Sequence, residues 1–361
     1  FENQFDADAE TLELTASKVY ADPNNGKPMT DGMFSFRVTA VGDEAATAPM
    51  GDRVQTDDQG NRYIDANVDI QTKDASFGTA KFQFDGHNHT FYYEVTENMP
   101  AGANEGNGYK VDGVTYDPTT FTVKVEVTYD DQTLDSKAVM SIYKGTYAAV
   151  SKAAADALAP MKVDGITFNN SYGTGGTTVD TGDAQTTATF YKVIDGRRWL
   201  DSDSFQFTIT PNDGGNGAST VTVTKDNPEA TLADPDRTAR SFNFGTVTFT
   251  DKDMTGAQMV DGKPTKTFTY TVKETAGDIV GMTYDSDREA TLTIIVVDNG
   301  NGTMTATPQV QNGVFTNTYS TSVDYAAAGG FQITKTLTGR DMTAGQFEFT
   351  VTPVNENAQE K

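Results

Sequence analysis

The stretch TFYYEVTEN at residues 90–98 returns as TFTYTVKET at residues 267–275. In both copies large apolar residues alternate with polar ones, which is the pattern of a β-strand with one buried face. Every second residue lies on the same face, and in each copy that face ends in an acidic residue, Glu97 or Glu274. The stretch therefore predicts a core strand that carries a glutamate on its apolar side.

Other strand-like blocks recur around this stretch in the same order. The pairs are SFGTAKF (76–82) and NFGTVTF (243–249), GVTYD (113–117) and GMTYD (281–285), and ITFNNSY (166–172) and GVFTNTY (313–319). An opening block occurs three times, as LTASKVY (14–20), TFYKVID (189–195) and QITKTLT (332–338). Turn residues separate the blocks, so the sequence predicts tandem all-β domains.

The repeat divides the chain into two whole units between two partial ones. We expect the closing strand of a preceding repeat at 1–5, repeat 1 at 8–172 with a short helical insert near 146–160, a linker at 173–186, repeat 2 at 187–319, a second linker at 320–330, and the opening strands of a further, incomplete repeat at 331–361. This phasing indicates a window cut from a longer tandem array. The insert follows from its alanines and from the proline that ends it.

Composition limits the classes of function. The 361 residues include 27 Lys and Arg against 51 Asp and Glu, a formal net charge of -24. Such a charge disfavours nucleic acid and anionic membranes as partners. No cysteine is present, which excludes disulfides, thiolate metal sites and a cysteine nucleophile. No apolar run approaches the roughly 20 residues that span a bilayer, so we expect no membrane insertion within this segment.

Three polar residues in each repeat lie on faces that are otherwise apolar. They are a lysine in the opening block, a glutamate in the central block and an asparagine in the closing block, namely Lys18, Glu97 and Asn170 in repeat 1 and Lys192, Glu274 and Asn317 in repeat 2. Burying any one of these side chains alone is costly. The plainer interpretation is a Lys–Glu pair near a sandwich edge, with an asparagine that caps a turn.

Buried together, the three residue types support one reaction. Burial lowers the pKa of a lysine and raises that of a glutamate until both favour the neutral form. A neutral amine held against an asparagine carboxamide attacks its carbon, forms a Lys–Asn isopeptide bond and releases ammonia. We expect the protonated glutamate to hydrogen-bond the asparagine carbonyl oxygen and to transfer the protons. The predicted chemistry is a single-turnover self-modification, and we expect no turnover enzyme.

These blocks resemble the streptococcal pilin isopeptide-linkage domains of Gram-positive pilins and surface adhesins, over essentially the whole chain. The resemblance places the cross-linked residues at Lys18, Asn170, Lys192 and Asn317, and the acidic catalysts at Glu97 and Glu274. It implies tandem immunoglobulin-like β-sandwich domains with intramolecular Lys–Asn isopeptide bonds. It also implies a location outside the cell, on the cell wall or a pilus.

The expected function is a structural stalk or pilin-shaft segment, whose partners are neighbouring repeats or pilin subunits. The alternative is an adhesin that binds a host protein or glycan through sandwich loops or the helical insert. Asn3 and Lys335 match the cross-linking positions of the two partial repeats, so we expect their bonds to involve residues outside this chain. A sharper version pairs Asn3 of one copy with Lys335 of another.

Three other features predict no separate site. His87 and His89 align with a plain turn in repeat 2, so we expect no metal there. The DNGNG stretch at 298–302 lacks the terminal glutamate of a calcium loop and is better interpreted as a hairpin turn. We expect Trp199 to be packed, or exposed in a loop, rather than part of a sugar platform. No cofactor is predicted.

Overall fold

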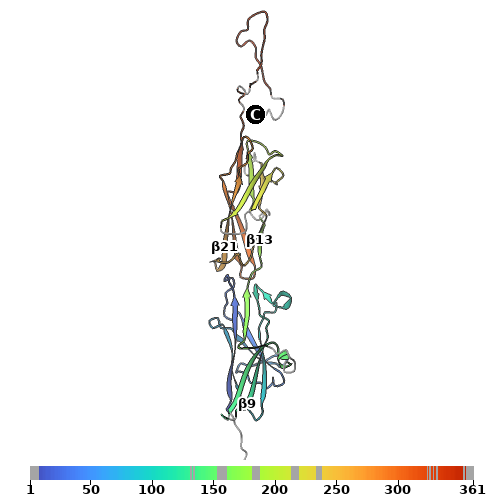
Figure 1. The fold of residues 1–361 in the computed structure, drawn as a ribbon, viewed down its shortest axis with the longest axis vertical. Helices are drawn as coiled ribbons and strands as arrows, with labels where there is room; N and C mark the ends of the chain where they lie inside the picture. Colours follow the sequence, from blue (N-terminus) through green and yellow to red (C-terminus); the bar gives the residue numbers. More distant parts are fainter. Residues whose placement is uncertain are drawn as a thin grey trace, which may run out of the picture.

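Two β-sandwiches lie end to end along the long axis of the molecule, and the segment after residue 320 extends beyond the second one (Figure 1). We call residues 10–172 the first sandwich and residues 177–319 the second. The computed structural model describes residues 8–352 and 354, except 131, 133–134, 153–160, 181–187, 213–218, 233–237, 323, 325–326, 328 and 331. Within these residues no helix has the length and apolar content that a bilayer span requires.

The first sandwich is formed almost entirely from strands. Its elements are β1 (Glu10–Ala21), β2 (Ser35–Val41), β3 (Gln55–Thr56), β4 (Arg62–Asn67), β5 (Asp74–Phe82), β6 (His89–Glu97), the 3-10 helix η1 (Glu105–Asn107), β7 (Lys110–Val111), β8 (Val114–Thr115), β9 (Phe121–Asp130), β10 (Asp135–Lys144), α1 (Tyr147–Lys152), β11 (Met161–Val163) and β12 (Thr167–Tyr172).

The described part of the second sandwich contains strands alone. They are β13 (Thr177–Asp180), β14 (Phe190–Asp195), β15 (Ser204–Pro211), β16 (Ser219–Thr224), β17 (Glu229–Thr231), β18 (Thr238–Phe242), β19 (Thr246–Phe249), β20 (Gln258–Val260), β21 (Lys263–Thr275), β22 (Met282–Thr283), β23 (Glu289–Asp298), β24 (Met304–Gln311) and β25 (Val314–Tyr319). The all-β, tandem-sandwich fold expected from the sequence is confirmed.

The sheets of the two sandwiches have matching strand orders. In the first sandwich, one sheet runs β5-β1-β12-β8-β7 and the facing sheet runs β11-β10-β9-β6-β2-β4-β3. In the second, the corresponding sheets are β17-β18-β14-β25-β22 and β16-β15-β21-β23-β24. In each case the opening strand pairs in parallel with the closing strand, β1 with β12 and β14 with β25. The first and last strands of each sandwich are therefore neighbours.

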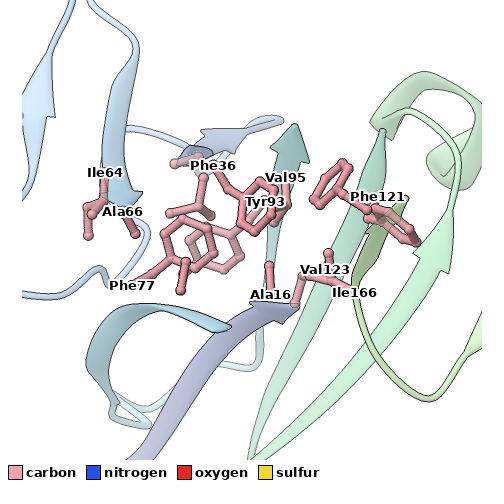
Figure 2. Packing of buried hydrophobic residues seen from close by; sticks show 14 of the residues in the cluster. Ala16, Phe36, Ile64, Ala66, Phe77, Tyr93, Val95, Phe121, Val123 and Ile166 are labelled. Carbon is pink, nitrogen blue, oxygen red and sulfur yellow. The ribbon is translucent and has the colours of Figure 1, made fainter. Parts of the chain in front are cut away.

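Aromatic residues from both sheets fill the cores. In the first sandwich Phe36 stacks on Phe168 with ring centroids 4.6 Å apart, and Phe121 meets Phe168 edge-on at 5.2 Å. Figure 2 shows Phe36, Tyr93 and Phe121 among the apolar side chains of this core. Fully burying a side chain of this size contributes about 1.5–3 kcal/mol. The alternating sequence blocks thus supply the inward faces of both sheets.

Tight turns place the short strands that follow the central block. Asp112 and Gly113 join β7 to β8 and both have positive φ, 48° and 82°. An Asp-Gly pair is favoured in such hairpins because two successive residues must adopt left-handed conformations. β8 then pairs with β12 through Ser171 and Tyr172, which brings the segment after β8 beside the closing strand.

Residues 173–186, predicted to be a linker, in part belong to the second sandwich. Thr177–Asp180 forms β13, which pairs antiparallel with β19. The side chain of Val179 is buried in the second core. Strand pairing with β19 thus holds residues 177–180 against the second sandwich. Residues 181–187 lie outside the described part of the chain.

Polar contacts join the two sandwiches directly. The hydroxyl of Tyr172 donates a hydrogen bond of 2.6 Å to Asp298 Oδ1 and accepts one of 3.2 Å from the backbone N–H of Gly302. The backbone N–H and hydroxyl of Thr174 both donate to the Asp251 carboxylate. Asp298 and Gly302 belong to the DNGNG turn between β23 and β24, so this turn is part of the junction.

Two predicted segments are only partly described. Of the expected helix near 146–160, Tyr147–Lys152 forms α1, and residues 153–160 lie outside the described part. The expected opening strands of a further repeat contain no strand among their described residues, and Phe349 there is 52% exposed. A strand pair without a facing sheet has no core in which to bury its apolar residues.

Candidate functional site

Each sandwich buries one lysine against one glutamate from the facing sheet. Lys18 on β1 lies with its Nζ 2.6 Å from Glu97 Oε1 on β6. Lys192 on β14 lies with its Nζ 2.8 Å from Glu274 Oε2 on β21. All four side chains have no solvent-exposed surface. The alternation in the opening and central blocks explains this placement, since both partners occupy inward positions of their strands.

The asparagine of each closing block completes the cluster. Asn170 on β12 donates from Nδ2 to Glu97 Oε1 at 2.7 Å, and Asn317 on β25 donates from Nδ2 to Glu274 Oε1 at 2.7 Å. The residues are 3% and 0% exposed. The structure therefore brings together both sets of three residues that the sequence singled out.

Strand register sets the spacing of the amine and the amide. In the parallel pair β1–β12, Lys18 lies opposite Phe168, and Asn170 lies opposite Tyr20. The same offset occurs in β14–β25, where Lys192 lies opposite Phe315. Lysine and asparagine are thus two positions apart on neighbouring strands and point into the same core. The long lysine side chain spans this offset.

The lysine amines lie among aromatic rings. Lys18 Nζ is 4.6 Å from the ring centroid of Phe34, and Lys192 Nζ is 4.8 Å from that of Phe205. Burial lowers the pKa of each lysine to about 8, although the attraction of the glutamate opposes this shift. Burial also raises the pKa of Glu274. In the second sandwich the two shifts act in the same sense, and both reduce the free-energy cost of moving a proton from the amine to the carboxyl.

The asparagine carbonyl oxygens contact groups that the sequence analysis did not identify. Asn170 Oδ1 accepts a hydrogen bond of 3.0 Å from the backbone N–H of Asp117, and Asn317 Oδ1 accepts one of 2.8 Å from that of Asp285. We expected the glutamate to bond this oxygen, whereas the structure has it contact the amide nitrogen instead. The repeated blocks GVTYD and GMTYD, which end at these aspartates, were the available signal.

The two residues expected to bond outside the chain belong to the partial repeats at its two ends. Asn3 lies outside the described residues. Lys335 is exposed, and its Nζ lies 4.7 Å from the ring centroid of Phe347. Their cross-linking stays a prediction.

Other candidate features have structural roles. His89 lies between Glu44 and Asp85, with a ring nitrogen 2.9 Å from each carboxylate. Among the described residues, no group of three or more His, Cys, Asp or Glu side chains is arranged to hold a metal ion. Trp199 packs edge-on against Phe205 and donates from Nε1 to the Thr238 carbonyl, so it is not an exposed platform.

Comparison with known proteins gives one family and several distant structures. The family profile FctA, described as a Spy0128-like isopeptide containing domain, matches residues 14–173 and 188–320. Curated protein sequences yield no match. The major pilin of Streptococcus pyogenes is 17% identical, with 86% of this chain and 98% of that chain covered and a TM-score of 0.27.

Two further solved structures are similar at the same level or lower. The major pilin T3.2 of Streptococcus pyogenes is 16% identical, with 88% of this chain and 100% of that chain covered and a TM-score of 0.27. The pilus adhesin SpaC of Lactobacillus rhamnosus GG is 10% identical, with 86% of this chain and 44% of that chain covered and a TM-score of 0.17.

Proposed function

Because this chain belongs to the family of Spy0128-like isopeptide-containing domains, we propose that it is a pilin-shaft segment in which each sandwich is closed by its own Lys–Asn isopeptide bond. Membership of the family supports a structural pilin role. The bonds would join Lys18 to Asn170 and Lys192 to Asn317, with Glu97 and Glu274 assisting. The extracellular, cell-wall-attached location and the neighbouring pilin subunits as partners belong to the same proposal.

One observation carries the proposal: the same arrangement occurs twice in one chain. In both sandwiches a buried carboxylate contacts the amine of a lysine and the amide nitrogen of an asparagine at 2.6–2.8 Å. An isolated buried Lys–Glu pair is a weak source of stability, because desolvation offsets the attraction. A reaction between lysine and asparagine would explain why both sandwiches bury such a cluster although it contributes little stability.

The contacts support a balanced proton route. In the first sandwich a proton moves from Lys18 Nζ to Glu97, and the neutral amine attacks Asn170 Cγ. The new C–N bond forms as the carboxamide nitrogen leaves with the protons that Glu97 relays, so one ammonia is released. Glu97 contacts both nitrogens, which is the position that a proton carrier between them requires.

The proposed bond would also redirect mechanical load. The chain enters the first sandwich through β1 and leaves through β12, which are adjacent parallel strands. With Lys18 joined to Asn170, tension would pass from β1 to β12 through covalent bonds and bypass the intervening strands. Such a unit does not extend under force, which suits a fibre exposed to shear.

Intact mass of the purified chain tests the proposal. Each bond removes one ammonia, about 17 Da as a covalent modification, so we expect two losses in the native chain. Glu97→Ala and Glu274→Ala should each abolish one loss. Glu126→Ala is a matched control, because Glu126 forms an ion pair with Lys124 at the surface, outside the buried cluster. An unmodified mass for the native chain would contradict the proposal.

A further inference from the structure

The repeated blocks GVTYD and GMTYD place an aspartate beside each cluster. Asp117 follows β8 and Asp285 follows β22, and their backbone N–H groups donate to the carbonyl oxygens of Asn170 and Asn317. The attack proposed above would place negative charge on these oxygens. A backbone N–H already directed at such an oxygen has the geometry of an oxyanion hole.

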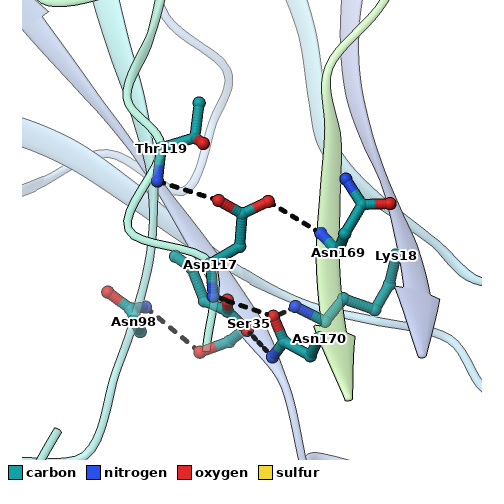
Figure 3. A network of polar contacts seen from close by, with 8 residues as sticks. Lys18, Ser35, Asn98, Asp117, Thr119, Asn169 and Asn170 are labelled. Atoms are coloured by element: carbon teal, nitrogen blue, oxygen red, sulfur yellow. Dashed lines mark hydrogen bonds and ion pairs between the residues drawn. The ribbon is translucent and has the colours of Figure 1, made fainter. Parts of the chain in front are cut away.

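The side chains of the same aspartates hold the strand that carries the asparagine. Asp117 Oδ2 accepts a hydrogen bond of 2.8 Å from the backbone N–H of Asn169, and its Oδ1 accepts one of 3.0 Å from Thr119 (Figure 3). Asp285 Oδ2 likewise accepts 3.0 Å from the backbone N–H of Thr316. In both sandwiches the contacted residue immediately precedes the reacting asparagine.

We infer that Asp117 and Asp285 are positioning residues for isopeptide formation, whose carboxylates clamp the closing strand so that their own backbone N–H groups hold the oxyanion. This inference rests on the proposed function. As the lysine Nζ–Cγ bond forms, the carbonyl electron pair moves onto Oδ1, where the backbone N–H stabilises it. The pair returns as the Cγ–Nδ2 bond breaks and ammonia leaves.

Hydrogen bonds keep the Asp117 carboxylate ionised. Burial acts to raise the pKa of Asp117, but the bonds from Thr119 and Asn169 hold it below its ordinary value. An ionised acceptor makes a stronger bond to a backbone N–H than a neutral one does. In the second sandwich Asp285 also accepts from Arg288 Nε at 2.7 Å, which restrains that carboxylate further.

Asp117→Asn tests the contact between the Asp117 carboxylate and the closing strand while leaving the contact to Thr119 in place. The amide oxygen can still accept from Thr119, but the amide nitrogen would face the N–H of Asn169 and could not accept from it. The test follows ammonia loss by mass during cell-free synthesis of the full chain, with samples quenched in acid at intervals. We expect bond formation in the first sandwich to slow about tenfold, less than the roughly 10²–10³ lost when an oxyanion donor is removed outright.

Internal and matched controls accompany this variant. The second sandwich of the same chain should form its bond at the native rate, and Asp285→Asn should reverse the pattern. Asp164→Asn, an exposed aspartate shortly before β12, should leave both rates unchanged. Circular dichroism of the purified Asp117→Asn chain would show whether it retains its β-structure, and a folded chain with a slow first bond is the expected result.

Three other outcomes would overturn the inference, and each would identify which part of it is wrong. A native rate in both variants would remove the aspartates from the reaction while the proposed function stands. The negative charge of Asp117 also raises the pKa of Lys18, which Glu97 and Asp117 both face. A variant that moves only the alkaline limb of the pH–rate profile, with an unchanged rate near neutral pH, would assign Asp117 that role instead. An unmodified native chain would overturn the proposed function and the clamp together.

Discussion

The two sandwiches hold the same cluster within different surroundings. Between β10 and β12 the first sandwich contains α1 and β11, whereas in the second a tight turn at Asn312 joins β24 directly to β25. The lysine–glutamate distances are nevertheless 2.6 and 2.8 Å. Geometry at the cluster is therefore set by the paired strands and the facing sheet, and the loops can vary without disturbing it.

The two clusters differ in which oxygen of the glutamate carboxylate each partner contacts. In the first sandwich, Lys18 and Asn170 both contact Glu97 Oε1, and the backbone N–H of Asp117 lies 3.2 Å from Oε2. In the second sandwich, Lys192 contacts Oε2 of Glu274 and Asn317 contacts Oε1. The second carboxylate thus bridges amine and amide with separate oxygens. Comparing the two reactions within one chain tests whether this difference matters.

The largest expected effect is on stability when one bond is prevented. Glu97→Ala should lower the free energy of unfolding of the first sandwich by roughly 5 kcal/mol, by the chain-entropy estimate for closing a loop of well over a hundred residues. Glu274→Ala should do the same to the second sandwich. Differential scanning calorimetry would show one transition moved in each variant. A single variant that shifts both transitions equally would refute the independence of the two sandwiches.

A smaller effect is expected at the junction. Tyr172→Phe removes the hydroxyl that donates to the buried carboxylate of Asp298. The substitution should lower the free energy of unfolding by about 1–3 kcal/mol. Small-angle X-ray scattering should show a wider range of angles between the sandwiches. Tyr319→Phe is the matched control at the far end of the second sandwich, where the ring lies 4.7 Å from Arg197. Unchanged scattering in Tyr172→Phe would show that β13 alone fixes the junction.

The pH dependence of bond formation should be similar in the two sandwiches on its alkaline side. The proposed reaction starts from a neutral amine and a protonated carboxyl, so each pair must retain one proton. The pKa of about 8 for Lys18 and Lys192 marks the loss of that proton. Above it the rate of ammonia loss should fall about tenfold per pH unit.

On the acid side the second sandwich should show its own limit. Burial raises the pKa of Glu274. The Lys192–Glu274 pair therefore takes up a second proton at a pH above the usual glutamate range. With both groups protonated, the amine is charged and cannot attack. The same quenched mass measurements, made across pH, would record both limbs. Rates that rise through pH 8 would instead indicate that the ionised carboxylate acts as a base.

The smallest effect belongs to the first sandwich alone. Hydrogen bonds that the His89 ring donates to Asp85 and Glu44 raise the pKa of His89, despite partial burial. This contribution to stability is complete below the unfolded pKa of about 6.5 and is lost as pH rises through the folded value. His89→Gln should remove the pH dependence of the first thermal transition over this range and leave the second transition unchanged. Salt should weaken the effect, because the carboxylate of Asp85 is exposed.

Much of the cluster could be predicted from the sequence because strand alternation is a local property. The parity of each block places Lys18, Glu97 and Asn170 on inward faces without any knowledge of the sheet order. Recurrence of the same three residue types in the second repeat then identified the cluster as a unit. The structure adds that lysine and asparagine lie on adjacent parallel strands and that the glutamate reaches them from the facing sheet.

The remaining features depend on distances between segments far apart in the chain. Every residue except proline carries a backbone N–H, so no sequence pattern shows that the N–H of Asp117 is the one directed at Asn170. That choice depends on the turn after β8 and on its pairing with β12. The junction is similar, because Tyr172 and Asp298 lie in different sandwiches and form a contact only where the two meet.

The sequence by itself determined the all-β class, the repeat and the inward faces that carry lysine, glutamate and asparagine, because alternation and recurrence are properties of the linear sequence. Only the tertiary structure decided which groups surround the asparagine oxygen, how the segment after Gly173 joins β19, and how the two sandwiches meet. Those features arise from turn conformation and strand register, which fix positions in space that local residue patterns do not encode.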